Sequence, residues 1–224
     1  MSLRTEQATC QGLAGPIDFI VDHPDDTPAG WALVLHPHPL HGGTRDNKVV
    51  TTVARACVQR GLLAIRPNFR GVGASAGEFD RAVGETADMV ALVEHVFQTW
   101  PQAASGPWVL AGFSFGSSVA AQLYAELADR GLPLPARLML IGCAVERFRH
   151  RPVSVPPDTL MIHGEHDEVV PLAEGMDFAR THQLAMTVVP DAGHFFHGKL
   201  LLLRQLVQSG LAGLPQPAIQ GTAA

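Results

Sequence analysis

The chain has 224 residues, a net charge of −5 and a hydrophobic share of 46%, which suits one globular domain with a single buried core. The acidic balance argues against nucleic acid as a partner, because no basic stripe could replace phosphate counterions, and no segment approaches the roughly 20 apolar residues that span a bilayer. Residues 1–16 lack the apolar core of a signal peptide, and the three cysteines are widely spaced. We therefore expect a cytoplasmic protein without a membrane partner, a disulfide framework or a zinc site.

Apolar runs rich in leucine and β-branched residues recur along the chain. Such near-continuous runs are typical of strands that are buried on both faces of a parallel sheet. A first strand is predicted at 17–21, before a turn at 24–30 that is rich in proline, aspartate and glycine. The further strands are predicted at 31–35, 62–67, 108–113, 137–143, 159–163 and 186–189.

Helical patterns lie between these strands. The first covers 46–61, and Asp46 or Asn47 can cap its start. Further helices are predicted at 85–98, at 117–130, from Pro171 onwards and at 196–209. Alternating strands and helices indicate a doubly wound, mostly parallel α/β sheet. We expect a single domain over 1–214 and a disordered C-terminal tail over 215–224.

The segment Gly112-Phe113-Ser114-Phe115-Gly116 lies where a predicted strand meets a predicted helix. In that context Gly-x-Ser-x-Gly is the pattern of a nucleophile elbow, a sharp bend that exposes a serine hydroxyl. The bend needs glycine where side chains would collide. At the start of the helix, the amide of Phe115 has no intrahelical acceptor, so it is a candidate donor to an oxyanion.

A reactive serine needs a base, and the base needs an orienting carboxylate. Asp167 and His194 stand in the loops that follow the last two predicted strands, so both are expected at the same edge of the sheet as Ser114. Glu165 and His166 are competing side chains. We favour Asp167 because it matches a His-Gly-x-x-Asp pattern.

Five segments between residues 35 and 200 carry a family resemblance. They read LHPHPLHGGTRDNKVV, RPNFRGVGASAGEFD, LAGFSFGSS, HGEHDEVVP and DAGHFFHGKL. Through them the chain resembles the α/β-hydrolase superfamily, and within it the small lidless serine hydrolases of bacteria. The resemblance implies an α/β-hydrolase fold without a lid or cap domain, with Ser114 as nucleophile, Asp167 as orienting acid and His194 as general base.

A second oxyanion donor is expected from the loop 36–43, which reads HPHPLHGG. Its two prolines have no amide hydrogen, so the candidates are His38, Leu40 and His41. We favour His38 and keep Leu40 as the alternative. No carboxylate or thiol accompanies the three histidines of this loop, so we expect no metal.

Other features have structural interpretations. The segment RGVGASAG opens no helix and is followed by no Walker lysine, so we interpret it as a tight loop and expect no cofactor. Arg66 and Arg70 are expected to brace this loop through ion pairs. Cys143 is expected to be a buried thiol, and His197 to pack or to cap a helix.

Only fifteen residues, 144–158, separate two of the predicted strands, and several of them are prolines. They are too few for a helical cap, so we expect an open cleft lined by Leu40, Phe113 and Phe195. Such a cleft favours carboxylic esters or thioesters of short acyl groups, cleaved through an acyl-enzyme intermediate. A peptidase or amidase with the same triad and a non-catalytic binding protein are the alternatives. The expected partner is a small-molecule acyl ester, and a homodimer is left open.

Overall fold

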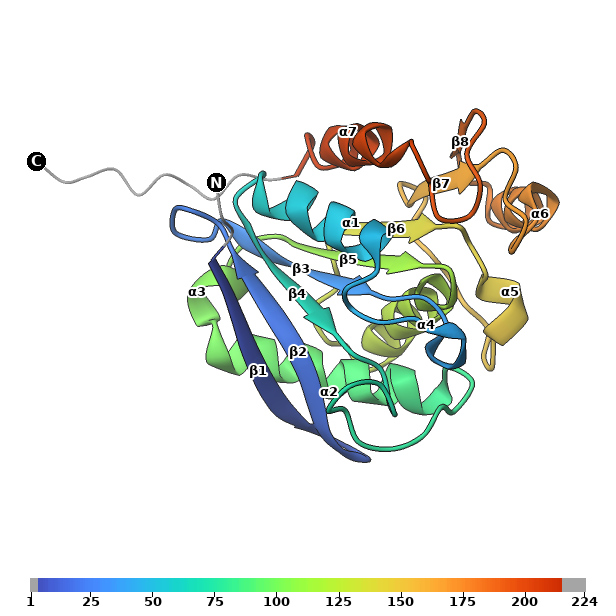
Figure 1. Cartoon of the computed structure of the whole chain (residues 1–224). Coiled ribbons are helices and arrows are strands. Elements are labelled where there is room, and N and C mark those ends of the chain that lie inside the picture. The colour runs from blue at the N-terminus through green and yellow to red at the C-terminus, as the bar shows by residue number, and fades with distance from the viewer. Residues whose placement is uncertain (1–3, 215–224) are drawn as a thin grey trace, which may run out of the picture.

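The computed structural model describes residues 4–214, which contain one eight-stranded sheet (Figure 1). The strand order is β1-β2-β4-β3-β5-β6-β7-β8. The pairs β1–β2 and β2–β4 are antiparallel, and the remaining pairs are parallel. The strands are β1 (Arg4–Gly12), β2 (Gly15–His23), β3 (Gly30–Leu35), β4 (Leu62–Pro67), β5 (Trp108–Phe113), β6 (Arg137–Ile141), β7 (Leu160–Gly164) and β8 (Met186–Val189). The mostly parallel α/β sheet predicted from the sequence is thus confirmed.

Helices cover both faces of this sheet (Figure 1). They are η1 (Pro39–His41), α1 (Lys48–Val58), α2 (Val83–Thr99), α3 (Pro101–Ala104), α4 (Phe115–Asp129), α5 (Val145–Phe148), α6 (Leu172–His182) and α7 (Leu200–Gly210). On β3, Leu33 and Leu35 pack into the core that includes α2 and α4, whereas Ala32 and Val34 pack into the core that includes α1 and α7. The central strands are apolar throughout because both of their faces are buried. Within residues 4–214, no helix has the length and apolar character needed to cross a membrane.

The main departure from the predicted strands is β1, which the sequence pattern does not reveal. This strand pairs only with β2, at the edge of the sheet, and most of its residues are exposed, with Cys10 as its one buried apolar side chain. An antiparallel edge strand with one solvated face carries no continuous apolar run. The strand predicted at 17–21 is longer in the structure, where it forms β2.

The observed helices α1, α2 and α4 differ from the predicted ranges by up to three residues at their ends. Asn47, and not Asp46, caps α1, since its Oδ1 accepts the Val49 amide hydrogen at 2.9 Å. The start predicted for the last helix is wrong, because α7 begins at Leu200 and not at 196. Phe196 has a φ of 53° and cannot continue a right-handed helix. The predicted disordered tail, 215–224, lies outside the described residues.

Buried ion pairs hold the loop that follows β4, as the sequence predicts. Arg66 Nε donates to Asp22 Oδ2 on β2 at 2.7 Å, and Arg70 Nε donates to Asp88 Oδ2 on α2 at 2.5 Å. The segment RGVGASAG lies within this loop, and its Ala76 amide donates to Pro16 O at 2.8 Å. The loop is therefore tied to the antiparallel edge of the sheet, next to the ends of the parallel strands.

Candidate active site

Ser114 occupies a strained bend between β5 and α4. Its φ of 55° and ψ of −121° lie outside the conformations that non-glycine residues favour. A Cβ at position 112 would lie 2.1 Å from Gly116 O, and one at 116 would lie 2.5 Å from Leu35 O. Both flanking glycines are thus needed for α4 to start so close to the sheet, which is the geometry expected of an elbow.

The backbone around the elbow is fixed by hydrogen bonds. The Ser114 amide donates to Ile141 O of β6 at 2.8 Å, and Ser114 O accepts from the amide of Ser117 at 2.8 Å and from its hydroxyl at 2.6 Å. The Ser117 hydroxyl in turn accepts the Ala144 amide hydrogen at 2.9 Å. These bonds hold the bend in place, so its strain is retained in the folded state.

Asp167 and His194, from the loops after β7 and β8, are in direct contact. The Nδ1 atom of His194 lies 2.7 Å from Asp167 Oδ2, and both side chains are buried. Asp167 Oδ1 accepts the amide hydrogens of Val169 at 3.0 Å and Val170 at 2.7 Å. Burial acts to raise the pKa of Asp167, but the hydrogen bonds from His194 and Val170 outweigh it, so this pKa lies below its usual value. An ionised Asp167 keeps the proton of His194 on Nδ1 and leaves Nε2 as a base.

The two competing side chains point elsewhere. Glu165 is exposed, and its Oε2 accepts the Asp191 amide hydrogen at 3.0 Å. His166 is also exposed, and its Nε2 lies 3.9 Å from Glu165 Oε2. Asp167 therefore contacts the imidazole of His194, whereas Glu168 Oε2 accepts the His194 amide hydrogen at 3.2 Å.

His163 is a residue at this site that the sequence analysis does not single out. Its imidazole is fully buried, and Nε2 lies 2.8 Å from Val170 O and 3.4 Å from Asp167 Oδ2. Its Nδ1 has no hydrogen-bond partner among residues 4–214, so the hydrogen is assigned to Nε2, which donates toward both oxygens. His163 thereby supports the loop that carries Asp167. Its only sequence signal is its position as the first letter of the HGEHD segment.

Ser114 and His194 line the same small pocket, which has a volume of about 90 Å³. Phe195 and Val169 also line it, together with the loop that contains His38. Within the described part of the chain no hydrogen bond joins the Ser114 hydroxyl to His194. Contacts of this kind commonly tighten when substrate binds.

Phe113 lies beneath this pocket and does not line it, which corrects the expectation that it forms part of the cleft surface. Its side chain is 1% exposed and packs against the imidazole of His194, with ring centroids 4.9 Å apart. Phe195 contacts the same imidazole edge-to-face at 5.0 Å and is 36% exposed. Gly142 completes the enclosure, since a Cβ there would lie 3.2 Å from His194 Cε1. The imidazole is thus held between two aromatic rings and a glycine.

Of the three candidate amides in the loop after β3, one is not already engaged within the described residues. The Leu40 amide donates to the His38 ring at 3.2 Å, and the His41 amide donates to His38 O at 3.1 Å. For the His38 amide, residues 4–214 supply no acceptor. His38 also lines the pocket of Ser114, and its ring packs on that of Phe115 with centroids 5.2 Å apart. Of the three candidate donors, His38 is therefore the one whose amide hydrogen is not used by another described residue.

His36 holds this loop against the loop that follows β4. Its Nε2 accepts the Phe69 amide hydrogen at 2.9 Å, so Nδ1 carries the proton and donates to Pro37 O at 2.6 Å. Burial lowers the pKa of His36 to about 4, so the ring is neutral at physiological pH. With both nitrogens occupied, His36 has none left for a metal ion.

Two other predicted residues are located by the structure. Cys143 is buried, and burial raises the pKa of its thiol to about 12, so it is a protonated packing residue. His197 is exposed beside Phe195, with ring centroids 6.0 Å apart.

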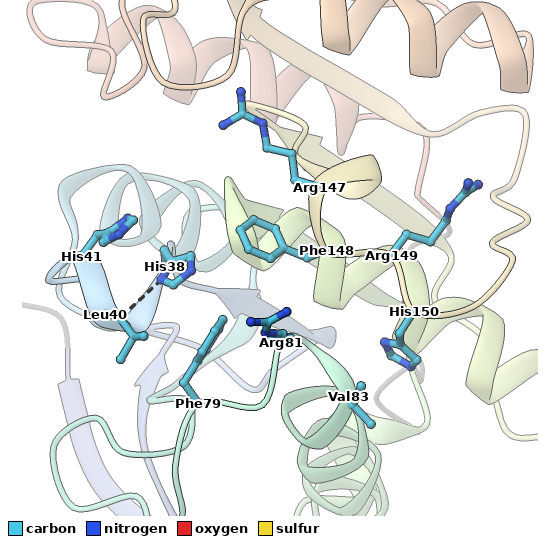
Figure 2. Close-up of a pocket in the computed structure, with 10 residues that line it drawn as sticks. All are labelled: His38, Leu40, His41, Phe79, Arg81, Val83, Arg147, Phe148, Arg149 and His150. Atoms are coloured by element: carbon cyan, nitrogen blue, oxygen red, sulfur yellow. Dashed lines mark hydrogen bonds between the residues drawn. The ribbon is translucent and has the colours of Figure 1, made fainter.

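A wider pocket of about 610 Å³ adjoins the small one, and Leu40 lines this wider pocket (Figure 2). His38 and His41 line both pockets. We call the wider pocket the arginine cleft. Its lining residues are His38, Leu40, His41, Phe79, Arg81, Val83, Arg147, Phe148, Arg149 and His150. Three loops that are distant in the sequence thus meet beside the elbow.

Comparison with known proteins identifies the family. No protein-family model matches the chain. An uncharacterized protein of Rickettsia prowazekii is 48% identical over 179 residues, which make up 75% of this chain and 72% of that protein. The mouse esterase OVCA2 is 32% identical over 91 residues, 38% of this chain and 40% of the esterase.

Solved structures give the same result at greater coverage. A serine hydrolase without a lid from Xanthomonas campestris is 37% identical, with a TM-score of 0.82 over 94% of this chain and 95% of that one. An α/β serine hydrolase homologue from Coxiella burnetii is 36% identical, with a TM-score of 0.79 over 95% of this chain and 100% of that one. The chain belongs to the lidless α/β serine hydrolases.

Proposed function

We propose that the protein is a carboxylesterase that hydrolyses esters or thioesters of short acyl groups with Ser114, His194 and Asp167 as its catalytic triad. One observation carries the proposal: His194 is oriented by a 2.7 Å hydrogen bond to Asp167 while it lines the same pocket as Ser114. The partial similarity to an esterase supports ester hydrolysis as the reaction. The small volume beside Ser114, about 90 Å³, favours a short acyl group.

The reaction has two halves. In the first, Ser114 Oγ attacks the carbonyl carbon while His194 Nε2 takes the hydroxyl proton, and the amides of Phe115 and His38 stabilise the oxyanion. Collapse of the resulting tetrahedral intermediate breaks the bond to the leaving group, which receives the proton from His194. An acyl group then remains on Ser114. In the second half, His194 Nε2 takes a proton from a water molecule, whose oxygen attacks the acyl carbon. The bond from this carbon to Ser114 Oγ then breaks, Oγ regains the proton from His194, and the carboxylic acid is released. One ester and one water thus give one acid and one alcohol.

The test compares p-nitrophenyl acetate, butyrate and octanoate as substrates for the wild type and the Ser114→Ala variant. We expect the two shorter esters to be preferred and the variant to lose at least about a thousandfold in kcat. The Ser105→Ala variant is the control, because Ser105 is an exposed serine that does not line the pocket. Ester turnover that survives Ser114→Ala, or turnover of a peptide anilide in place of the esters, would contradict the proposal.

A further inference from the structure

The arginine cleft has a charge opposite to that of the chain. Its ten lining residues include three arginines and three histidines but no aspartate or glutamate, whereas the whole chain has a net charge of −5. A concave site lined by one sign of charge raises the local concentration of ligands of the other sign. The cleft therefore favours an anion.

Of the three arginines, Arg81 is the one available to a ligand. Arg147 is bound in a fork by Glu174, with distances of 2.6 and 2.7 Å, and Arg149 lies 3.1 Å from Glu146. Among residues 4–214, no carboxylate lies within ion-pair distance of Arg81. The adjacent Asp80 is directed to Arg70, 3.8 Å away. Figure 2 shows Arg81 near Phe79 and Phe148 in the lining of the cleft, where the residue is exposed.

The backbone that carries Arg81 is strained. Arg81 has a φ of 50° and Ala82 a φ of 73°, and both lie in the left-handed region that favours glycine. Hydrogen bonds on either side retain this conformation: the Val83 amide donates to Asp80 O at 2.9 Å, and the Asp80 amide donates to Glu85 Oε1 at 2.8 Å. Retained strain of this kind clusters at binding sites. Arg81 thus lines the cleft from a backbone conformation that is strained for a residue other than glycine.

The remaining walls suit a carbon chain. Leu40, Phe79, Val83 and Phe148 contribute apolar surface to the cleft, and the rings of Phe79 and Phe148 pack against that of His38, with centroids 4.6 and 5.3 Å apart. A ligand that extends from Ser114 past His38 therefore meets apolar side chains first and a guanidinium afterwards. Carboxylate and phosphate are the groups that a guanidinium binds in a bidentate fork.

We propose that the arginine cleft binds an anionic group of the substrate, so that the preferred esters carry a carboxylate or a phosphate-type group several carbons from the reacting carbonyl. This inference rests on the proposed ester hydrolysis. It adds a substrate class to that reaction: negatively charged acyl compounds, which the cleft would favour over neutral esters of the same length.

The kinetic test uses three matched p-nitrophenyl esters. They are the glutarate monoester, with a free carboxylate; its methyl ester, which is neutral; and the 4-phosphonobutyrate, with a phosphonate. For Arg81→Gln we expect the ratio of kcat/KM for the charged esters to that for the neutral ester to fall roughly tenfold, the loss of about one charge-assisted hydrogen bond, mainly through KM. Arg81→Lys retains the charge and most of the ratio. The carboxylate and phosphonate esters show which anion the cleft prefers.

Arg55→Gln is the control, because Arg55 is an exposed arginine of α1 that does not line the cleft. The inference is wrong if Arg81→Gln leaves the ratio unchanged or if Arg55→Gln lowers it equally. Its failure is distinguishable from that of the proposed function, because Ser114→Ala tests turnover of all three esters alike. Should the wild type turn over none of them, calorimetric titration with glutarate decides: weaker binding to Arg81→Gln supports the anion site, and equal binding overturns it.

Discussion

Replacing Asp167 by asparagine tests the orientation of His194 with little change in shape. Asparagine keeps an oxygen for the amides of Val169 and Val170, which now bond Oδ1 at 3.0 and 2.7 Å. Its NH₂ group then replaces the oxygen that lies 2.7 Å from His194 Nδ1. Since NH₂ can only donate, His194 must accept at Nδ1 and carry its hydrogen on Nε2.

A hydrogen on Nε2 removes the base that faces Ser114. We expect kcat for a short p-nitrophenyl ester to fall by about 10⁴-fold near neutral pH, the size of the effect when a triad carboxylate becomes an amide. That factor corresponds to roughly 5 kcal/mol of transition-state stabilisation. The assay is steady-state release of p-nitrophenol, with circular dichroism to show that the variant is folded.

Glu165→Gln is the matched control, because Glu165 lies two positions away, is exposed and bonds the Asp191 amide, not His194. Its activity should stay within about twofold of the wild type, as expected for an exposed side chain outside the site. A loss below about tenfold in Asp167→Asn, or an equal loss in the control, would refute the assignment of Asp167 as the orienting acid.

Two further predictions concern buried histidines around the site. The pKa of His36 lies at about 4 in the folded chain against an ordinary value of 6.5, so between these values the unfolded chain binds a proton that the folded chain does not. The free energy of unfolding should therefore decrease as the pH falls through this window, by up to about 3 kcal/mol. His36→Gln should flatten that slope in urea titrations, whereas the exposed His197→Gln should leave it intact; equal slopes in wild type and His36→Gln would show that another group is responsible. His163→Leu leaves Val170 O without its 2.8 Å donor, so we expect a loss of roughly 2 kcal/mol and a fall in Tm of about 4–8 °C by calorimetry. An unchanged Tm would mean that water replaces the imidazole.

The parallel strands could be predicted because a strand that is buried on both faces appears in the sequence as a continuous apolar run. The predicted strands 62–67, 108–113 and 186–189 coincide with β4, β5 and β8. A strand with one solvated face lacks such a run, which is why the sequence pattern does not reveal β1. The start of α7 was misplaced for a different reason, since a local left-handed turn at Phe196 is invisible to an apolar pattern.

The candidate site could likewise be predicted only in part. The positions of Ser114, Asp167 and His194 follow from strand ends, so the sequence places them at one edge. The direction of a side chain does not follow: Phe113 turns beneath His194, and His163 reaches an aspartate only because the next loop folds back over it. The arginine cleft combines three loops whose mutual distance has no sequence signal at all.

His38 and His41 line both the pocket of Ser114 and the arginine cleft, so the proposed sites for reaction and for anion binding share a wall. A substitution of either histidine would therefore alter the lining of both pockets at once. Engineering of selectivity is therefore better begun at Val83 or Arg81, on the far wall, where the scissile carbonyl would not be disturbed.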